Sequence, residues 1–278
     1  MLTAKRGELT FDVHQWGPAD GDPVLLLHGF PQRGQSWDAV AARLADAGLR
    51  CFAPDQRGYS PGARPSRRRD YVLPELVADA VAVLDEVVGP NGRVHLVGHD
   101  WGAAVAWSLA ARHPDRIATL TAVSVPPPKA FLRSLLTSRQ GFASWYMYLF
   151  QLPWLPERLL GSPARVARVL RGIGQSRAAA ERDAAAFADP GLLTAALNWY
   201  RAMFVAPPSF DPPVTVPTLF VWSDRDTALT RHSTLHAQEQ VVGPYEFVEL
   251  RGVSHWIPDE APGQLADLVR AHVDAGPR

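Results

Sequence analysis

Residues 94–104 read Val-His-Leu-Val-Gly-His-Asp-Trp-Gly-Ala-Ala, and the fold can be recognised from these eleven positions. An apolar run that suits a buried strand leads into a Gly-x-Asp-x-Gly turn centred on Asp100, and helix-forming alanines follow it. A tight turn between a strand and a helix holds one side chain exposed at the strand end, an arrangement called a nucleophile elbow. The free N–H groups of the following helix favour negative charge at the same place. The pattern therefore predicts that Asp100 is a nucleophile.

An aspartate in this turn, where a serine is more usual, restricts the chemistry. A carboxylate attacks saturated carbon, so Asp100 could open an epoxide ring or displace a halide. The product would be an ester of the enzyme's own carboxylate, whose carbonyl water can attack beside an oxyanion hole. The alternative is that Asp100 only caps the helix that follows it. As a nucleophile, Asp100 argues against an ordinary esterase or peptidase.

Short apolar runs alternate with helical patterns on both sides of the elbow. Such alternation predicts an α/β fold, with a mostly parallel sheet flanked by helices. The rhythm breaks at residues 128–212, where the pattern is helical, prolines cut it into short pieces, and no strand is evident. We therefore expect a core domain formed by residues 1–127 and 213–278, with an inserted helical cap subdomain at residues 128–212.

An acid and a histidine follow the nucleophile in the order that this kind of fold uses. Asp226 lies just after the predicted strand at residues 216–222, and His255 lies just after the one at residues 245–250. Strand ends are where open α/β sheets place their sites. We expect Asp226 to orient His255, and His255 to deprotonate the hydrolytic water. Asp224 is a rival for the role of the acid.

The composition sets limits on partners and location. The chain has 278 residues, 28 basic and 28 acidic side chains, a net charge of zero and a single cysteine. This balance points to neither nucleic acid nor a membrane as a partner, and one cysteine allows no intrachain disulfide. No apolar stretch has the length of a signal peptide or a membrane span. We expect a cytoplasmic monomer or homodimer that needs no metal or organic cofactor.

Five motifs, in order along nearly the whole chain, resemble those of the epoxide hydrolases of the α/β-hydrolase fold. They are His-Gly-Phe-Pro at 28–31 with Ser-Trp at 36–37, Asp-Gln-Arg-Gly-Tyr-Ser at 55–60, the elbow, Leu-Asn-Trp-Tyr-Arg at 197–201, and the segments around Asp226 and His255. Each motif alone would be a weak signal, whereas the combination is specific. The resemblance implies the α/β-hydrolase fold with a helical cap.

The resemblance also implies roles for individual residues. The backbone N–H groups of Phe30 and Trp101 would form the oxyanion hole, and the bond from Phe30 to Pro31 would be cis. A pair of cap tyrosines would donate protons to the epoxide oxygen. Tyr200 matches one of them through Asn-Trp-Tyr-Arg. Tyr146 is our choice for the other, from its spacing to Phe-Gln-x-Pro, with Tyr148 as the local competitor.

Nine tryptophans are many for this length, and several lie in or beside the motifs. Core packing explains some of them, but an aromatic-walled, dry pocket would also use them. We expect Trp37, Trp199 and Trp256 to line the pocket and the substrate to be a hydrophobic epoxide.

The function that these residues indicate is hydrolysis of an epoxide to a vicinal diol through a covalent Asp100 ester. A haloalkane dehalogenase would share Asp100, Asp226 and His255, but its halide would need different donors from the two tyrosines. A third possibility is a protein of this fold that binds a small molecule without turnover. An intact catalytic triad argues against it.

Overall fold

One mixed sheet forms the centre of the molecule. The computed structural model describes residues 1–205 and 210–276, and in these residues the sheet has eight strands. They are β1 Leu2–Arg6, β2 Leu9–Trp16, β3 Pro23–Leu27, β4 Arg50–Pro54, β5 Val94–His99, β6 Ile117–Val123, β7 Thr218–Ser223 and β8 Tyr245–Leu250. The spatial order is β1-β2-β4-β3-β5-β6-β7-β8. Only the pairings of β1 with β2 and of β2 with β4 are antiparallel, so the predicted fold class is confirmed.

Helices of the core segments flank this sheet. They are α1 Asp38–Asp46, α2 Leu73–Val88, α3 Trp101–Arg112, α11 Arg231–Thr234, α12 Ile257–Glu260 and α13 Pro262–Asp274. Short 3-10 turns complete these segments, namely η1 Gly34–Trp37, η2 Arg68–Tyr71, η3 Pro114–Arg116 and η5 Gln238–Gln240. The strand β1 was not predicted from the sequence, because its alternation of apolar and charged residues is short and half exposed.

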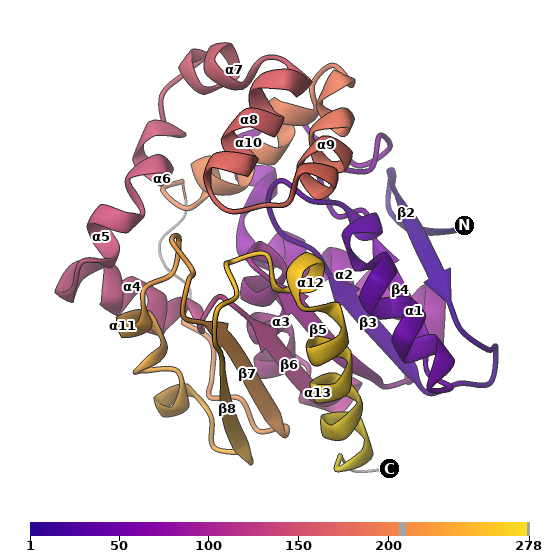
Figure 1. The fold of residues 1–278 in the computed structure, drawn as a ribbon. Coiled ribbons are helices and arrows are strands. Elements are labelled where there is room, and N and C mark those ends of the chain that lie inside the picture. The colour runs from indigo at the N-terminus through magenta and orange to yellow at the C-terminus, as the bar shows by residue number, and fades with distance from the viewer. Residues whose placement is uncertain (206–209, 277–278) are drawn as a thin grey trace.

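Alternate residues of the central strands build two separate cores. Leu25 and Leu27 of β3 pack with residues of α2 and α3. Val24 and Leu26 of the same strand pack with residues of α1 and α13 on the opposite face. Figure 1 shows these helix pairs on the two sides of the sheet. Because both faces are covered, the central strands are apolar throughout, as expected for parallel strands.

A helical insertion joins β6 to β7. It comprises α4 Pro128–Thr137, α5 Gln140–Ala143, α6 Trp145–Leu149, α7 Leu155–Leu160, α8 Pro163–Gly172, α9 Arg177–Ala185, η4 Ala186–Ala188 and α10 Leu192–Ala202. In Figure 1 these helices lie above and beside the carboxyl ends of the strands. The segment contains no strand in its described part, while residues 206–209 of the predicted cap lie outside the described residues. Among residues 1–205 and 210–276, no helix combines the length and hydropathy needed to cross a bilayer.

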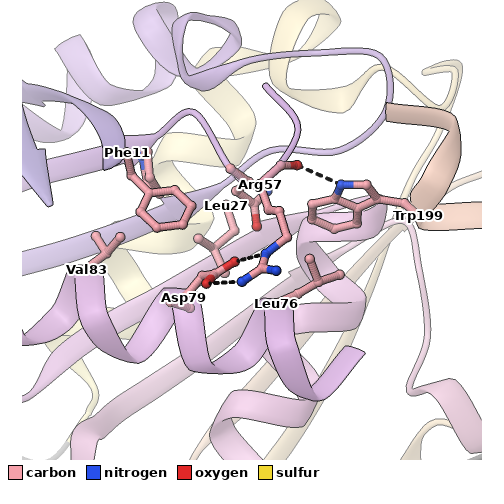
Figure 2. A pocket seen from close by; sticks show the side chains of 10 residues that line it. Phe11, Leu27, Arg57, Leu76, Asp79, Val83 and Trp199 are labelled. Atoms are coloured by element: carbon pink, nitrogen blue, oxygen red, sulfur yellow. Dashed lines mark hydrogen bonds and ion pairs between the residues drawn. The ribbon is translucent and has the colours of Figure 1, made fainter. Parts of the chain in front are cut away.

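A buried ion pair holds the loop that follows β4. The guanidinium of Arg57 binds both carboxylate oxygens of Asp79 on α2, with Nε 2.6 Å from Oδ2 and Nη2 2.7 Å from Oδ1. The backbone carbonyl of Arg57 accepts a hydrogen bond from Trp199 Nε1 at 2.8 Å. Figure 2 shows these contacts around a small cavity that Phe11 and Val83 also line. Arg57 therefore connects the core to the insertion, because Trp199 belongs to α10.

Two glycines allow the elbow to pack against β3. A Cβ atom on Gly102 would lie 2.1 Å from the carbonyl oxygen of Leu27, and one on Gly98 would lie 2.3 Å from the oxygen of Gly102. Both approaches are far shorter than van der Waals contact and involve backbone atoms, which cannot move aside alone. Only glycine fits at these two positions, because β3, β5 and α3 approach one another so closely there. The positive φ of 53° belongs to Asp100, which lies between them.

We expect Gly102→Ala to lower the free energy of unfolding by about 3 kcal/mol, because the new methyl group collides with the backbone of β3. Gly172→Ala is the matched control, since Gly172 is also helical but nothing lies within 4 Å of its added Cβ. That control should be neutral or raise stability by up to about 1 kcal/mol. Urea unfolding of both variants measures the difference, and equal stabilities would contradict this account of the elbow.

Candidate active site

Asp100 lies at the junction of β5 and α3 with φ 53° and ψ −122°. Its carboxylate is buried and meets the loop after β3. A Cβ atom on Gly29 would lie 2.3 Å from both Cβ and Oδ1 of Asp100, so only glycine lets the loop come this close. The approach brings the N–H group of Phe30 to 2.7 Å from Asp100 Oδ1. The sequence His-Gly-Phe-Pro therefore delivers a backbone donor to the carboxylate.

The two N–H groups expected from the resemblance meet at this carboxylate. Phe30 N donates to Oδ1, and a hydrogen bond from the backbone N–H of Trp101 helps to lower the pKa of Asp100. The Phe30–Pro31 bond is cis, which confirms that expectation. Buried His28 holds the loop, since its Nε2 accepts a hydrogen bond from Gln56 N at 3.1 Å. Burial lowers the pKa of His28 to about 4, so the ring is neutral and can accept.

His255 lies between two carboxylates. Its Nε2 is 3.5 Å from Asp100 Oδ2, and its Nδ1 is 2.7 Å from Asp226 Oδ2. The other oxygen of Asp226 accepts hydrogen bonds from the backbone of Ala228 and Leu229, both at 2.8 Å, which fix the carboxylate. The rival acid, Asp224, instead accepts from Gly252 N at 2.6 Å. The structure thus brings Asp100, His255 and Asp226 together and leaves Asp224 outside.

The charges of this group are strongly coupled. Burial by itself lowers the pKa of His255, but the nearby carboxylates of Asp226 and Asp100 outweigh burial and raise that pKa to about 10. Burial by itself raises the pKa of Asp100, but the hydrogen bond and charge of His255 outweigh it and hold that pKa below its ordinary value. The favoured state in the free protein is therefore an imidazolium between two carboxylates.

Two phenols of the insertion lie close enough to Asp100 to be affected by its charge. Tyr146 of α6 and Tyr200 of α10 have ring centroids 6.1 Å apart, and Tyr200 also packs edge-on against Trp101 at 5.2 Å. Burial raises the pKa of both phenols, and the Asp100 charge raises it further, so both stay protonated. A hydrogen bond with the side chain of Trp101 partly offsets this rise in the pKa of Tyr200. Tyr148 is exposed on the other side of α6 and has no such position.

Neighbouring motif residues fix the two phenols relative to each other. Gln151 of Phe-Gln-x-Pro donates from Nε2 to the carbonyl of Tyr200 at 3.1 Å. Arg201, which follows Tyr200, donates to the carbonyl of Phe150 at 2.9 Å and forms an ion pair with Glu157 at 2.7 Å. These bonds tie α6 and α7 to α10. The polar residues of both motifs therefore position the tyrosines.

The three expected pocket tryptophans have different surroundings. Trp256 packs edge-on against His255 at 5.3 Å, and Trp199 packs against Trp101 at 5.7 Å. Trp37, in contrast, is fully buried with residues of α1 and α13 on the other face of the sheet. This corrects the expectation that Trp37 lines the pocket. The indole fills the apolar core because the turn that carries it leads directly into α1.

A buried polar network beneath the site was missed from the sequence. Gln32 Nε2 donates to Asp259 of α12 at 2.8 Å, and Gln32 Oε1 lies 3.2 Å from Nδ1 of His99. His99 Nε2 in turn lies 2.9 Å from the carbonyl oxygen of His255. Arg182 of α9 completes the network with ion pairs to Asp259 at 2.8 Å and to Asp183 at 2.7 Å. No local pattern could reveal it, because its members come from four distant segments.

The network joins three segments that each carry part of the site. Gln32 follows the loop that carries Phe30, Asp259 follows His255, and Arg182 belongs to the insertion. Buried charges are stable only when paired and hydrogen-bonded, so these contacts fix the three segments relative to one another. Within residues 1–205 and 210–276, no group of three His, Cys, Asp or Glu side chains has the arrangement of a metal site.

Comparison with known proteins identifies relatives along nearly the whole chain. Residues 22–168 match the family model described as alpha/beta hydrolase fold. The chain is 35% identical to Epoxide hydrolase A of Mycobacterium tuberculosis, over 88% of each protein. It is 34% identical to Epoxide hydrolase 2 of Caenorhabditis elegans, over 91% of this chain and 73% of that protein. Among solved structures, Epoxide Hydrolase A from Mycobacterium thermoresistibile superimposes with a TM-score of 0.81 at 28% identity, covering 99% of this chain and 98% of that one.

The Gln32 network makes a prediction about stability. Gln32→Leu keeps the volume but removes the donor to the buried Asp259 carboxylate, so we expect a loss of about 2 kcal/mol in the free energy of unfolding. Gln35→Leu is the matched control, because Gln35 lies three residues away and is exposed. It should change stability by less than about 0.5 kcal/mol. Urea unfolding distinguishes the two, and a Gln32→Leu protein as stable as the control would contradict the role of the network.

Proposed function

The chain belongs to the epoxide hydrolases of the α/β-hydrolase family, and from this premise we propose that it converts an epoxide to a vicinal diol through a covalent ester of Asp100. Asp100, His255 and Asp226 are the proposed catalytic triad. Tyr146 and Tyr200 are the proposed acids of the ring-opening step, and the backbone N–H groups of Phe30 and Trp101 form the proposed oxyanion hole. The helical insertion serves as the cap that covers this site.

The pair of buried phenols near Asp100 carries this proposal. Opening an epoxide places negative charge on an oxygen that never leaves the substrate, and that oxygen needs a proton. A phenol is a neutral donor at pH 7. The pKa of both Tyr146 and Tyr200 is raised by burial and by Asp100, so both protons are present when the substrate arrives. A departing halide needs no proton, so two phenols favour an epoxide over a haloalkane.

The first step forms the ester. Asp100 Oδ1 is held by Phe30 N, which leaves Oδ2 as the attacking atom. A new bond forms between Oδ2 and an epoxide carbon, and the bond from that carbon to the ring oxygen breaks. The oxygen takes a proton from one of the two tyrosines, while the other shares its negative charge through a hydrogen bond. Attack on saturated carbon by a carboxylate suits this geometry and needs no metal.

The second step hydrolyses the ester. Esterification removes the charge of Asp100, and this charge helps to raise the pKa of His255 in the free protein. The imidazolium then returns a proton to the phenolate and becomes a neutral base. It takes a proton from water, whose oxygen attacks Cγ of Asp100, and the developing oxyanion at Oδ1 is stabilised by Phe30 N and Trp101 N. Collapse breaks the bond between Cγ and Oδ2, and the proton of the added hydroxyl passes to the departing Oδ2, which releases the diol and restores the carboxylate.

The surroundings of the site favour an apolar substrate. Aromatic and aliphatic residues of the insertion and core pack around Tyr200, among them Phe30, Met147 and Phe150. Such walls exclude water and strengthen the electrostatic interactions inside. We therefore propose a hydrophobic epoxide and water as the substrates.

The two phenols can be tested in a His255→Gln background, where the ester should accumulate because its hydrolysis lacks a base. Adding Tyr146→Phe and Tyr200→Phe together should slow formation of the styrene oxide adduct on Asp100 by at least about a hundredfold, since the alkoxide loses both donors. Intact mass over time, with peptide mapping of the adduct, gives the rate. Adding Tyr148→Phe is the control and should leave it unchanged. Adduct formation at an unchanged rate without both phenols would refute their role.

The charge coupling can be tested by titrating His255. Asp100→Ala removes a negative charge that stabilises the imidazolium, so the pKa of His255 should fall from about 10 towards its ordinary value of 6.5. Asp224→Asn is the control, because Asp224 binds the Gly252 backbone instead of His255, and it should leave that pKa unchanged. The pKa of His255 in each variant can be measured by following the NMR signals of its imidazole ring against pH. An unshifted pKa in Asp100→Ala would show that Asp100 does not control the base.

A further inference from the structure

The segment that forms α5 and α6 carries both buried and exposed large apolar side chains. The inner face, with Met147 and Phe150, packs around Tyr200. The outer face presents Phe142, Trp145 and Tyr148, with exposed fractions of 84%, 63% and 55%. Trp145 and Tyr148 are three residues apart on α6 and share one side of that helix, while Phe142 lies on the preceding helix α5. A helix that is apolar all round is normally buried, which indicates that the outer face has a partner.

Further exposed apolar side chains lie in the same stretch of the chain. Together we call these side chains the outer surface of the insertion and define it by six exposed residues, Leu136, Phe142, Trp145, Tyr148, Leu152 and Trp154. In Figure 1 the helices that carry or flank them run up one side of the molecule, from α4 beside α11 of the core to α7 at the top. Six large apolar side chains within nineteen residues form a concentration that exceeds the scattered exposure expected of a monomer.

Basic side chains outnumber acidic ones in this part of the insertion, although Arg133 of α4 is paired with Glu239 of the core at 2.9 Å. Residues 128–173 contain seven basic residues and one acidic residue, although the whole chain is neutral. The single acid, Glu157, is bound to Arg201 inside the insertion. Arg139 and Arg158 stand beside the exposed aromatics, are themselves exposed, and form no ion pair within the described part of the chain. The net charge suggested no membrane partner because a sum over the chain hides where the charges lie.

From this combination we propose that the outer surface of the insertion docks on an anionic phospholipid bilayer. Aromatic and aliphatic side chains bury themselves at the boundary of headgroups and acyl chains, while arginines bind lipid phosphates. A second copy of the chain fits less well. A two-fold contact through this surface would bring Arg139 and Arg158 of both copies into one interface, and the six residues that define the surface include no carboxylate to pair with them.

Docking would bring the site close to an apolar phase. Tyr146 lies on α6 between Trp145 on the outer face and Met147 on the inner face. A hydrophobic epoxide concentrates in the acyl region of a bilayer, so it could reach the site without crossing bulk water. This consequence rests on the proposed function, whereas the docking itself does not.

Binding to vesicles tests the proposal on the whole chain without any epoxide. Vesicles of phosphatidylcholine with phosphatidylglycerol should pull down the protein, and vesicles of phosphatidylcholine alone should bind it more weakly. Raised salt should weaken binding to the anionic vesicles without abolishing it. Phe142→Gln should lower the partition coefficient about tenfold or more. Val242→Gln is the matched control, being an equally simple change at an exposed position of the core, and should have no effect.

Substitution of exposed arginines tests the electrostatic part of the binding. Arg139→Gln should weaken binding to the anionic vesicles about fivefold, and Arg251→Gln, an exposed arginine of the core, should not. Equal binding to both kinds of vesicle, or equal effects of Phe142→Gln and Val242→Gln, would overturn the proposal. A dimer in solution that Phe142→Gln dissociates would also overturn it and make the surface an interface between copies. Turnover of a water-soluble epoxide, measured in the same variants, reports separately on the proposed function.

Discussion

The ion pair between Asp100 Oδ2 and His255 Nε2, 3.5 Å apart, is the interaction on which the rest of the site depends. Burying a carboxylate is costly unless charge and hydrogen bonds compensate for it. Here the compensation comes from His255 on one oxygen and from Phe30 N on the other. The close approaches at Gly29, Gly98 and Gly102 bring these backbones together. In the proposed mechanism the contacts that make the buried charge tolerable also orient it for attack, so stability and reactivity would have one structural origin.

The core and the insertion contribute different chemistry. The core supplies charged groups from the ends of three strands of one sheet, namely Asp100 after β5, Asp226 after β7 and His255 after β8. The insertion supplies neutral donors from short helices, which Gln151 and Arg201 hold together. In the proposed cycle the charge of Asp100 controls both sets, since it raises the pKa of the phenols and of His255 and disappears when the ester forms. Formation of the ester could therefore convert His255 from an imidazolium paired with Asp100 into a neutral base.

Local sequence patterns predicted the parts of the structure that local physics controls. Short apolar runs predicted the central strands. Short motifs at strand ends predicted the elbow and favoured Asp226 over Asp224. The position of Trp37 was wrong, because sequence proximity to a motif does not say which face of the sheet a turn will cover. The network of Gln32, His99 and Asp259 was missed, because long-range packing alone brings those residues together. The domain boundaries stay a prediction, as does the division of roles among the site residues.

The central claim is that an enzyme carboxylate, and not free water, attacks the epoxide. A single turnover in water labelled with oxygen-18, with enzyme in excess over styrene oxide, tests it directly by mass spectrometry of the diol. An Asp100 ester requires a first-turnover diol without label, because its new oxygen is Oδ2, and it requires the label to appear in the peptide that contains Asp100. A labelled diol and an unlabelled Asp100 peptide would mean direct attack by water and would contradict the covalent mechanism.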